Sequence, residues 1–177
     1  MSQPGSNQLK VLFEREEIAK AVASIAAEIR QDYQGKRLLL VGVLKGSFIF
    51  MSDLVRQLDM DIEIVFVQLA SYYSATESSG KVTLIQDIQK AVTGKDVLVI
   101  EDIVDTGITT NFLLEHLKKK KPASLKLCAL VDKPSQHRVA VSIDYLGFSL
   151  PNKFIVGYGM DFDEQFRGLP CICCLEK

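Results

Sequence analysis

The sequence lacks a large excess of charge of either sign. Its 21 Lys and Arg side chains face 22 Asp and Glu side chains, so the formal net charge is −1, and no global basic field is present to hold nucleic acid. No apolar run approaches the roughly 20 residues that a membrane-spanning helix needs. Residues 1–10 are polar and lack the apolar core of a signal peptide. We therefore expect a cytoplasmic protein.

Clusters of soft metal ligands are also scarce. The two histidines, His116 and His137, are isolated from each other and from the cysteines. In a strand, two cysteines two positions apart share a face, and the next one points away. A structural zinc site needs four ligands, so we interpret the thiols as reduced and structural, although prone to oxidation. Four cysteines are present, three of them within the last seven residues: Cys128, Cys171, Cys173 and Cys174.

The 177 residues are enough for one domain with a hydrophobic core. Apolar runs typical of buried strands alternate with helical patterns, which predicts an α/β fold with a mainly parallel sheet and helices on both faces. Ligands of such sheets bind beyond the carboxyl ends of the strands. We predict strands at 38–44, 62–69, 82–85, 96–103, 125–131, 143–148 and 154–158, and helices at 13–33, 48–58 and 109–120.

Three segments lie outside this pattern. Residues 1–9 are expected to be a flexible tail. The polar, hydroxyl-rich residues 71–81 predict a mobile loop. Residues 154–174 predict a strand-rich flap added to the sheet.

The most informative segment is residues 98–110, LVIEDIVDTGITT. A β-branched apolar run ends at the adjacent carboxylates Glu101 and Asp102, and Asp105 follows. The Gly/Thr turn at 106–110, just before a helix, can aim several backbone N–H groups at one anion, with Thr110 among its hydroxyls. A phosphate at this turn, with hydroxyls or a metal at the acidic pair, predicts a phosphorylated sugar as the ligand.

This segment resembles the phosphoribosyl-diphosphate (PRPP) signature of the phosphoribosyltransferases. Four further segments, in the same order along the chain, are similar to the 6-oxopurine phosphoribosyltransferases, the hypoxanthine-guanine salvage enzymes. They are LVGVLKG at 40–46, Ser71-Tyr72, LVDKP at 130–134, and FIVGYGMD at 154–161 with Arg167. The resemblance covers roughly residues 38–170. It implies the type I phosphoribosyltransferase fold, a central mainly parallel sheet with a small strand-rich hood.

The resemblance gives the acidic pair a role. Two adjacent carboxylates on a strand repel each other and are costly to bury, so they need a cation or hydroxyl donors. By resemblance, Glu101 and Asp102 bind the ribose hydroxyls and Mg²⁺, for which Mn²⁺ can substitute, and Asp161 is a further metal ligand. Because both the diphosphate and these acids are anionic, we expect strict dependence on the divalent cation.

The resemblance also implies that Asp105 is the catalytic base that accepts the N7 proton of the purine, a task suited to a positioned carboxylate. Aspartate is equally favoured as a helix N-cap, and both roles are compatible. Thr106, Gly107, Ile108 and Thr109 are expected to hold the 5′-phosphate. Ile108 departs from the basic or polar residue that many relatives carry, which is harmless only if the backbone does the binding.

Leu44, Lys45, Gly46 and Arg167 are the expected pyrophosphate ligands. The family has a cis peptide bond before this lysine, which is otherwise very rare outside proline. A guanidinium suits the paired oxygens of a diphosphate. Without the resemblance, these residues would be interpreted as a strand end and a surface charge.

The same resemblance implies a purine site. Lys133 would donate to the O6 atom of the base, which discriminates against 6-amino purines. Phe154 would stack on the ring, Ile155 would offer backbone groups, and Asp161 lies at the same edge. Otherwise, Lys133 is a surface residue in a turn and Phe154 a core residue.

The resemblance therefore implies an enzyme that joins hypoxanthine or guanine to PRPP, giving IMP or GMP and pyrophosphate. Ser71 and Tyr72 would begin a loop that closes over the site and excludes water. The family is usually a homodimer or homotetramer. Two alternatives remain, a xanthine-preferring enzyme and an RNA-binding regulator of pyrimidine genes. The lysine run 118–121 is better interpreted as a solvated helix end.

Overall fold

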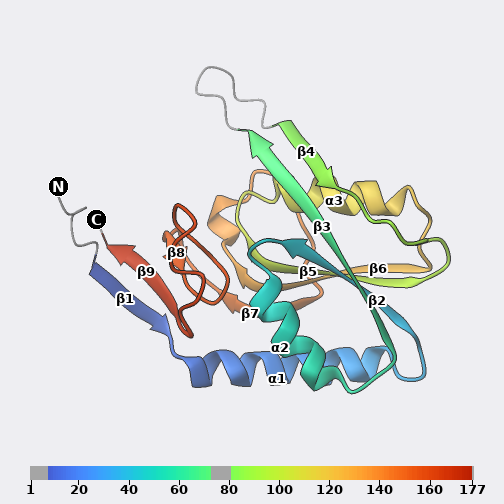
Figure 1. Ribbon diagram of the computed structural model, residues 1–177, viewed down its shortest axis with the longest axis horizontal. Coiled ribbons are helices and arrows are strands. Elements are labelled where there is room, and N and C mark those ends of the chain that lie inside the picture. The colour runs from blue at the N-terminus through green and yellow to red at the C-terminus, as the bar shows by residue number, and fades with distance from the viewer. Residues whose placement is uncertain (1–7, 73–80, 177) are drawn as a thin grey trace.

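The computed structural model describes residues 8–72 and 81–176. In this part of the chain, a six-stranded sheet lies beside a three-stranded one (Figure 1). The strands are β1 (Gln8–Phe13), β2 (Leu38–Leu44), β3 (Ile62–Tyr72), β4 (Lys81–Gln86), β5 (Asp96–Val104), β6 (Ser124–Asp132), β7 (Tyr145–Ser149), β8 (Ile155–Val156) and β9 (Ile172–Glu176). The helices are α1 (Arg15–Asp32), α2 (Phe48–Leu58), α3 (Ile108–Lys118) and the short 3₁₀ turn η1 (Pro134–Gln136).

The large sheet has the strand order β4-β3-β2-β5-β6-β7. Strands β3, β2, β5, β6 and β7 run parallel, and only β4 is antiparallel to its neighbour. The predicted mainly parallel sheet is therefore confirmed. Because the strands share one direction, the chain segments that follow β2, β5 and β6 all leave the same edge of the sheet.

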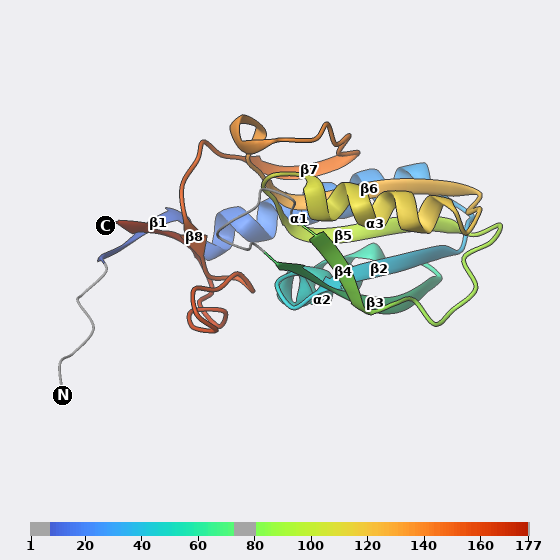
Figure 2. The ribbon, with the colours of Figure 1, turned by 90° about the horizontal axis from the view of Figure 1, so that it is seen from above.

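Helices cover both faces of this sheet (Figure 2), as predicted. In β2, Leu38 and Leu40 pack in one core with α1 and α2, whereas Leu39 and Val41 pack in a second core with α3. This follows from the alternation of side chains along a strand. A strand covered on both sides consists of a continuous apolar run, which is why β2 and β5 are recognisable in the sequence.

The first helix begins two residues later than predicted. The Glu14 backbone N–H donates to the Glu17 side chain at 2.8 Å, and the two residues form a reciprocal capping box at the start of α1. Phe13 instead ends β1, and its ring stacks on Phe148 with the ring centroids 3.9 Å apart. Among the described residues, no helix is both long and apolar enough to cross a membrane.

The smaller sheet, the hood, has the order β1-β9-β8 with antiparallel pairing. It joins the two ends of the described chain, since Gln8 pairs with Glu176 (Figure 1). The predicted flap at 154–174 is confirmed as part of it. The predicted flexible tail at 1–9 is wrong for residues 8 and 9, which belong to β1, and residues 1–7 lie outside the described part.

The C-terminal cysteines occupy the faces expected of them. The sulfur atoms of Cys171 and Cys173 lie 3.4 Å apart, so these residues share a face, while Cys174 pairs in register with Ile155. All four cysteines are free thiols, and burial raises the pKa of Cys173 to about 11. A raised pKa keeps the thiol protonated and unreactive.

The predicted bounds of the loop, 71–81, are wrong at both ends, because the residues there belong to two paired strands. Ser71 and Tyr72 are the last residues of β3, and Lys81 is the first residue of β4, paired in register with Tyr72. Residues 73–80 lie outside the described part of the chain.

Candidate active site

The turn after β2 lies between the end of β5 and the hood. The Leu44–Lys45 peptide bond is cis, as the family resemblance implies. A Cβ atom added to Gly46 would lie 1.8 Å from a carboxylate oxygen of Asp102, and one added to Gly159 would lie 2.0 Å from the Gly46 carbonyl oxygen. Both contacts require glycine, because any side chain would push the three segments apart.

Glu101 and Asp102 leave β5 on opposite faces, since successive side chains of a strand alternate. Glu101 is buried and accepts a long hydrogen bond, 3.4 Å, from the hydroxyl of Thr110 on α3. Asp102 lies over Gly46 on the hood side. The predicted pair is therefore two separate carboxylates, and the hydroxyl of Thr110 serves Glu101 in addition to any role in the turn.

The electrostatic state of these acids follows from their burial. Burial, with the nearby Asp102 charge, holds the pKa of Glu101 well above its usual range. Burial also raises the pKa of Asp102 to about 6, where Arg167 opposes the shift and Asp161 adds to it. Both shifts arise first from burial, and a cation bound beside the two carboxylates would oppose them. This edge of the sheet is thus suited to an incoming cation.

Asp105 and Lys133 meet just beyond the ends of β5 and β6. The Lys133 ammonium lies 3.8 Å from an Asp105 carboxylate oxygen, and the Lys133 backbone N–H donates to the Val104 carbonyl at 2.9 Å. The lysine side chain is 6% exposed, whereas that of Asp105 is 52% exposed. The structure thus brings together the two residues predicted to handle the proton and the base, with the carboxylate open to a ligand.

The turn between β5 and α3 is built around Gly107, which has a φ of +76° and is the N-cap of α3. A Cβ atom there would lie 2.8 Å from the Val139 carbonyl oxygen. Among the residues that the structure describes, the cap has no side-chain hydrogen bond, and the Ile108 N–H has only a 3.4 Å contact with the Thr106 hydroxyl. N–H groups at such a helix start are available to an anion.

The side chain of Ile108 does not take part in this turn. It lines a hollow on the outer surface of α3 together with Val82 and Phe112. The backbone can therefore offer its N–H groups whichever side chain stands at position 108.

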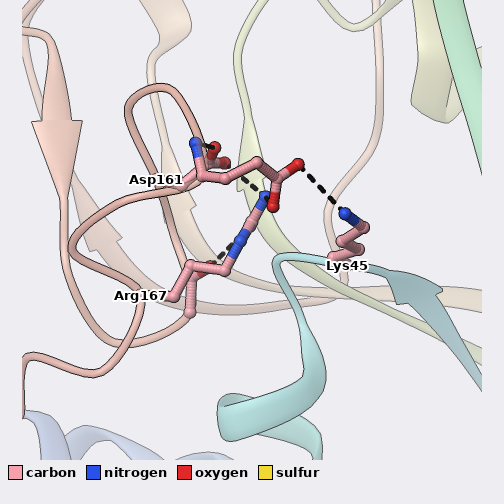
Figure 3. Close-up of polar contacts among 5 residues, drawn as sticks. Lys45, Asp161 and Arg167 are labelled. Carbon is pink, nitrogen blue, oxygen red and sulfur yellow. Dashed lines mark hydrogen bonds and ion pairs between the residues drawn. The ribbon is translucent and has the colours of Figure 1, made fainter.

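The loop 157–169 of the hood carries the remaining charged residues (Figure 3). The Arg167 guanidinium contacts Asp161 at 2.8 Å and donates to the Gly159 carbonyl at 2.9 Å. Glu164 contacts Arg167 at 3.2 Å and Lys45 at 3.0 Å. The structure thus joins the predicted ligands Lys45, Asp161 and Arg167 into one network.

Two members of this region were missed in the sequence. Phe154 is 52% exposed, and its ring meets that of Phe162, 46% exposed, edge to face at 5.5 Å. Phe162 is the first missed residue, and it forms an exposed aromatic pair with Phe154. The interpretation of Phe154 as a core residue is wrong, whereas Ile155 beside it is buried. Glu164 is the second missed residue. Its only sequence signal is a carboxylate three positions after Asp161 and three before Arg167.

A divalent cation fits the donors on the hood side. Within the described residues, no three His, Cys, Asp or Glu side chains converge into a complete metal site. Asp102 and Asp161 nevertheless interact electrostatically, and their carboxylates are the hard ligands that Mg²⁺ prefers. Mg²⁺ is commonly held by one or two carboxylates together with substrate phosphates and water. The donors present fit an ion that arrives with a phosphorylated substrate.

Comparisons with known proteins agree with this geometry. Residues 8–163 match the phosphoribosyl transferase domain model. The chain is 42% identical to the hypoxanthine-guanine phosphoribosyltransferase of Bacillus subtilis, over 94% of this chain and 93% of that protein.

It is also 43% identical to the bifunctional protein TilS/HprT of Listeria innocua over 94% of this chain, but it spans only 26% of that protein. A crystal structure of a hypoxanthine-guanine phosphoribosyltransferase from Bacillus anthracis superposes with a TM-score of 0.91 at 42% identity, covering 96% of this chain and all of that one. The chain therefore belongs to the hypoxanthine-guanine phosphoribosyltransferases, within the phosphoribosyl transferase family.

Proposed function

We propose that the protein is a purine-salvage transferase that joins a 6-oxopurine, hypoxanthine or guanine, to PRPP. N9 of the base attacks C1′ of PRPP, the bond from C1′ to the diphosphate breaks, and IMP or GMP forms with release of pyrophosphate. The observation that carries the proposal is the meeting of Asp105 and Lys133 beside the N-terminus of α3, in a chain of this family.

Asp105 is the general base in this proposal. As the bond at N9 forms, the proton on N7 becomes acidic and passes to the exposed Asp105 carboxylate. Lys133 donates to O6 of the same ring, and its burial favours a fixed position for the ammonium. A 6-amino group would meet this donor with another donor, so adenine is disfavoured. The exposed ring of Phe154, with Phe162, stacks on the base.

The phosphates lie on either side of the ribose. The turn of Thr106, Gly107, Ile108 and Thr109 binds the 5′-phosphate through N–H groups and hydroxyls. The backbone at Leu44, with Lys45, Gly46 and Arg167, binds the diphosphate. Asp102 and Asp161 would hold Mg²⁺, with Glu101 near the ribose hydroxyls, and the ion would supply positive charge beside the departing diphosphate. Ser71 and Tyr72 end β3 and precede residues 73–80, which lie outside the described part of the chain.

The direct test is pyrophosphate release from PRPP with Mg²⁺, measured with hypoxanthine, guanine, xanthine, adenine and uracil in parallel. We expect turnover with hypoxanthine or guanine that EDTA abolishes and excess Mg²⁺ or Mn²⁺ restores. Turnover with xanthine alone would redefine the substrate. Silence with all five bases, with PRPP still bound, would contradict the proposal and make RNA binding the next assay.

We further propose that the protein acts in the cytoplasm as a homodimer or homotetramer. The support is the family to which the chain belongs. Light scattering after size-exclusion chromatography measures the assembly, and a monomeric mass at micromolar concentration would contradict it.

A further inference from the structure

Glu164 occupies a central position among the diphosphate ligands proposed above. One carboxylate oxygen lies 3.0 Å from the Lys45 ammonium, and the other lies 3.2 Å from the Arg167 guanidinium. The two cations come from separate parts of the fold, the turn after β2 and the hood (Figure 3). A single carboxylate thus bridges the two groups that would otherwise grip the diphosphate.

The backbone of the loop makes this bridge possible. Asp163, Glu164 and Phe166 all have positive φ angles, 51°, 59° and 72°, so the loop coils tightly in a conformation that L residues seldom adopt. The Glu164 N–H donates to the Asp161 carboxylate at 2.9 Å, which ties the coil to the residue beside Arg167. The loop therefore directs Glu164 toward Lys45.

The bridge is charged and accessible. The contacts with Lys45 and Arg167 lower the pKa of Glu164, which therefore stays ionised. Its side chain is 63% exposed and that of Lys45 is 55% exposed, so both can move into water when a competitor arrives. The Arg167 Nε atom, by contrast, is buried and has no hydrogen-bond partner among the described residues. Such an orphaned donor indicates that the arginine is not fully satisfied by its carboxylates.

We propose that Glu164 is an internal competitor of the diphosphate: its carboxylate bridges Lys45 and Arg167 in the free protein and is displaced when PRPP or pyrophosphate binds. This inference rests on the proposed function and adds to it a residue that sets the affinity for the diphosphate. A diphosphate offers more anionic oxygens than a single carboxylate, so it can replace the carboxylate at both cations. The bridge therefore keeps Lys45 and Arg167 in position in the free protein and still allows the diphosphate to bind.

The test is the dissociation constant of inorganic pyrophosphate with Mg²⁺, measured by calorimetry on the full chain. Glu164→Gln keeps the shape of the side chain and removes its charge, so the dissociation constant should fall about fivefold. Asp163→Asn is the matched control. It removes the same charge one position away, and Asp163 is exposed and has no described ion pair. This control should change the constant by less than about twofold.

The outcomes separate the two proposals. Tighter binding in Glu164→Gln but not in Asp163→Asn supports the competitor. Equal changes in both variants, or weaker binding in Glu164→Gln, would overturn it, because Glu164 would then act as one surface charge among others or as a positioning residue. Failure of the unaltered protein to bind either pyrophosphate or PRPP would overturn the proposed function as well. The KM for PRPP should fall with the same factor, while base preference stays unchanged.

Discussion

Two glutamates on opposite sides of the site show opposite behaviour. Glu101, on β5, has a pKa well above its usual range because it is buried near Asp102. Glu164, in the hood loop, has a lowered pKa because Lys45 and Arg167 both contact it. The same side chain is driven toward the neutral form in one region and the charged form in the other.

The difference shows how the site divides its chemistry. The end of β5 collects carboxylates and has few described cations to balance them, which suits a divalent ion supplied with the substrate. The hood contributes Arg167 and faces Lys45 of the turn after β2, and its own carboxylates already balance these two cations. This arrangement suits an anion that replaces one of the carboxylates. The end of β5 thus requires an added cation, whereas the hood side replaces its own carboxylate with the anion of the substrate.

The sharpest test of this division is Asp105→Asn on the sheet side. The amide keeps the shape but cannot accept the N7 proton, so kcat should fall by about two to four orders of magnitude. The KM for PRPP should change little. Steady-state kinetics with hypoxanthine measures both. Equal losses in kcat and in PRPP affinity would assign Asp105 a structural role in the turn.

Lys133→Met should have the next largest effect. Methionine fills a similar buried volume but removes the donor to O6, so kcat/KM for hypoxanthine should fall by about two orders of magnitude. The ratio of hypoxanthine to adenine activity should fall as well. Competition assays with both bases measure this ratio. An unaltered base preference would remove Lys133 from the purine site.

Asp102→Asn should sharpen the comparison in stability as well as in rate. The folded protein holds a proton at Asp102 up to about pH 6, whereas the usual pKa is 3.8. This group's contribution to stability therefore falls as the pH rises from about 4 to about 6, and remains unfavourable above that. The asparagine should raise the free energy of unfolding by about 3 kcal/mol at pH 8 and by only about 0.5 kcal/mol at pH 4.

Urea denaturation of both proteins at the two pH values measures this effect, in the absence of divalent ions. An equal gain at pH 4 and pH 8 would show that charge is not its cause. The same substitution should abolish most of the activity, since it removes a proposed Mg²⁺ ligand. One substitution would then raise the free energy of unfolding and lower the activity.

Tyr158→Phe should have the smallest effect. The Tyr158 hydroxyl donates to Asp53 on α2 at 2.5 Å and ties the hood to the body of the protein. Its loss should cost about 1 kcal/mol of unfolding free energy and raise the KM for PRPP modestly. Tyr158→Phe combined with Asp53→Asn is the double-mutant cycle that isolates this contact. An additive cycle would show that the contact is not a tie.

The parts of the fold visible in the sequence are those with local signals. Strands β2 and β5 are buried on both faces and are therefore continuous apolar runs, and the 98–110 segment combines a strand end with a helix start. The pairing of β1 with β9 escaped prediction, because it joins residues 159 to 168 positions apart and neither strand is long. Nothing local distinguishes Gln8 and Leu9 from a polar tail.

For the candidate site, the sequence suggested residues but not the contacts between them. The family resemblance named Lys45, Asp161 and Arg167, but not the carboxylate that bridges them. Glu164 reaches Lys45 across 119 positions of sequence, and only the positive φ angles of its loop bring it there. The separation of Glu101 from Asp102 follows from strand alternation. Which carboxylate faces α3 and which faces the hood is visible only in the structure.

The pairing of β1 with β9 brings the first and last described strands together. Gln8 and Glu176 are register partners at one edge of the hood, so a short linker could join these two positions without disturbing a strand. New ends could then be opened at the exposed turn around Gly94, between β4 and β5. Such a circular permutant would fix the hood covalently from both sides, and the site would no longer depend on two chain ends finding each other.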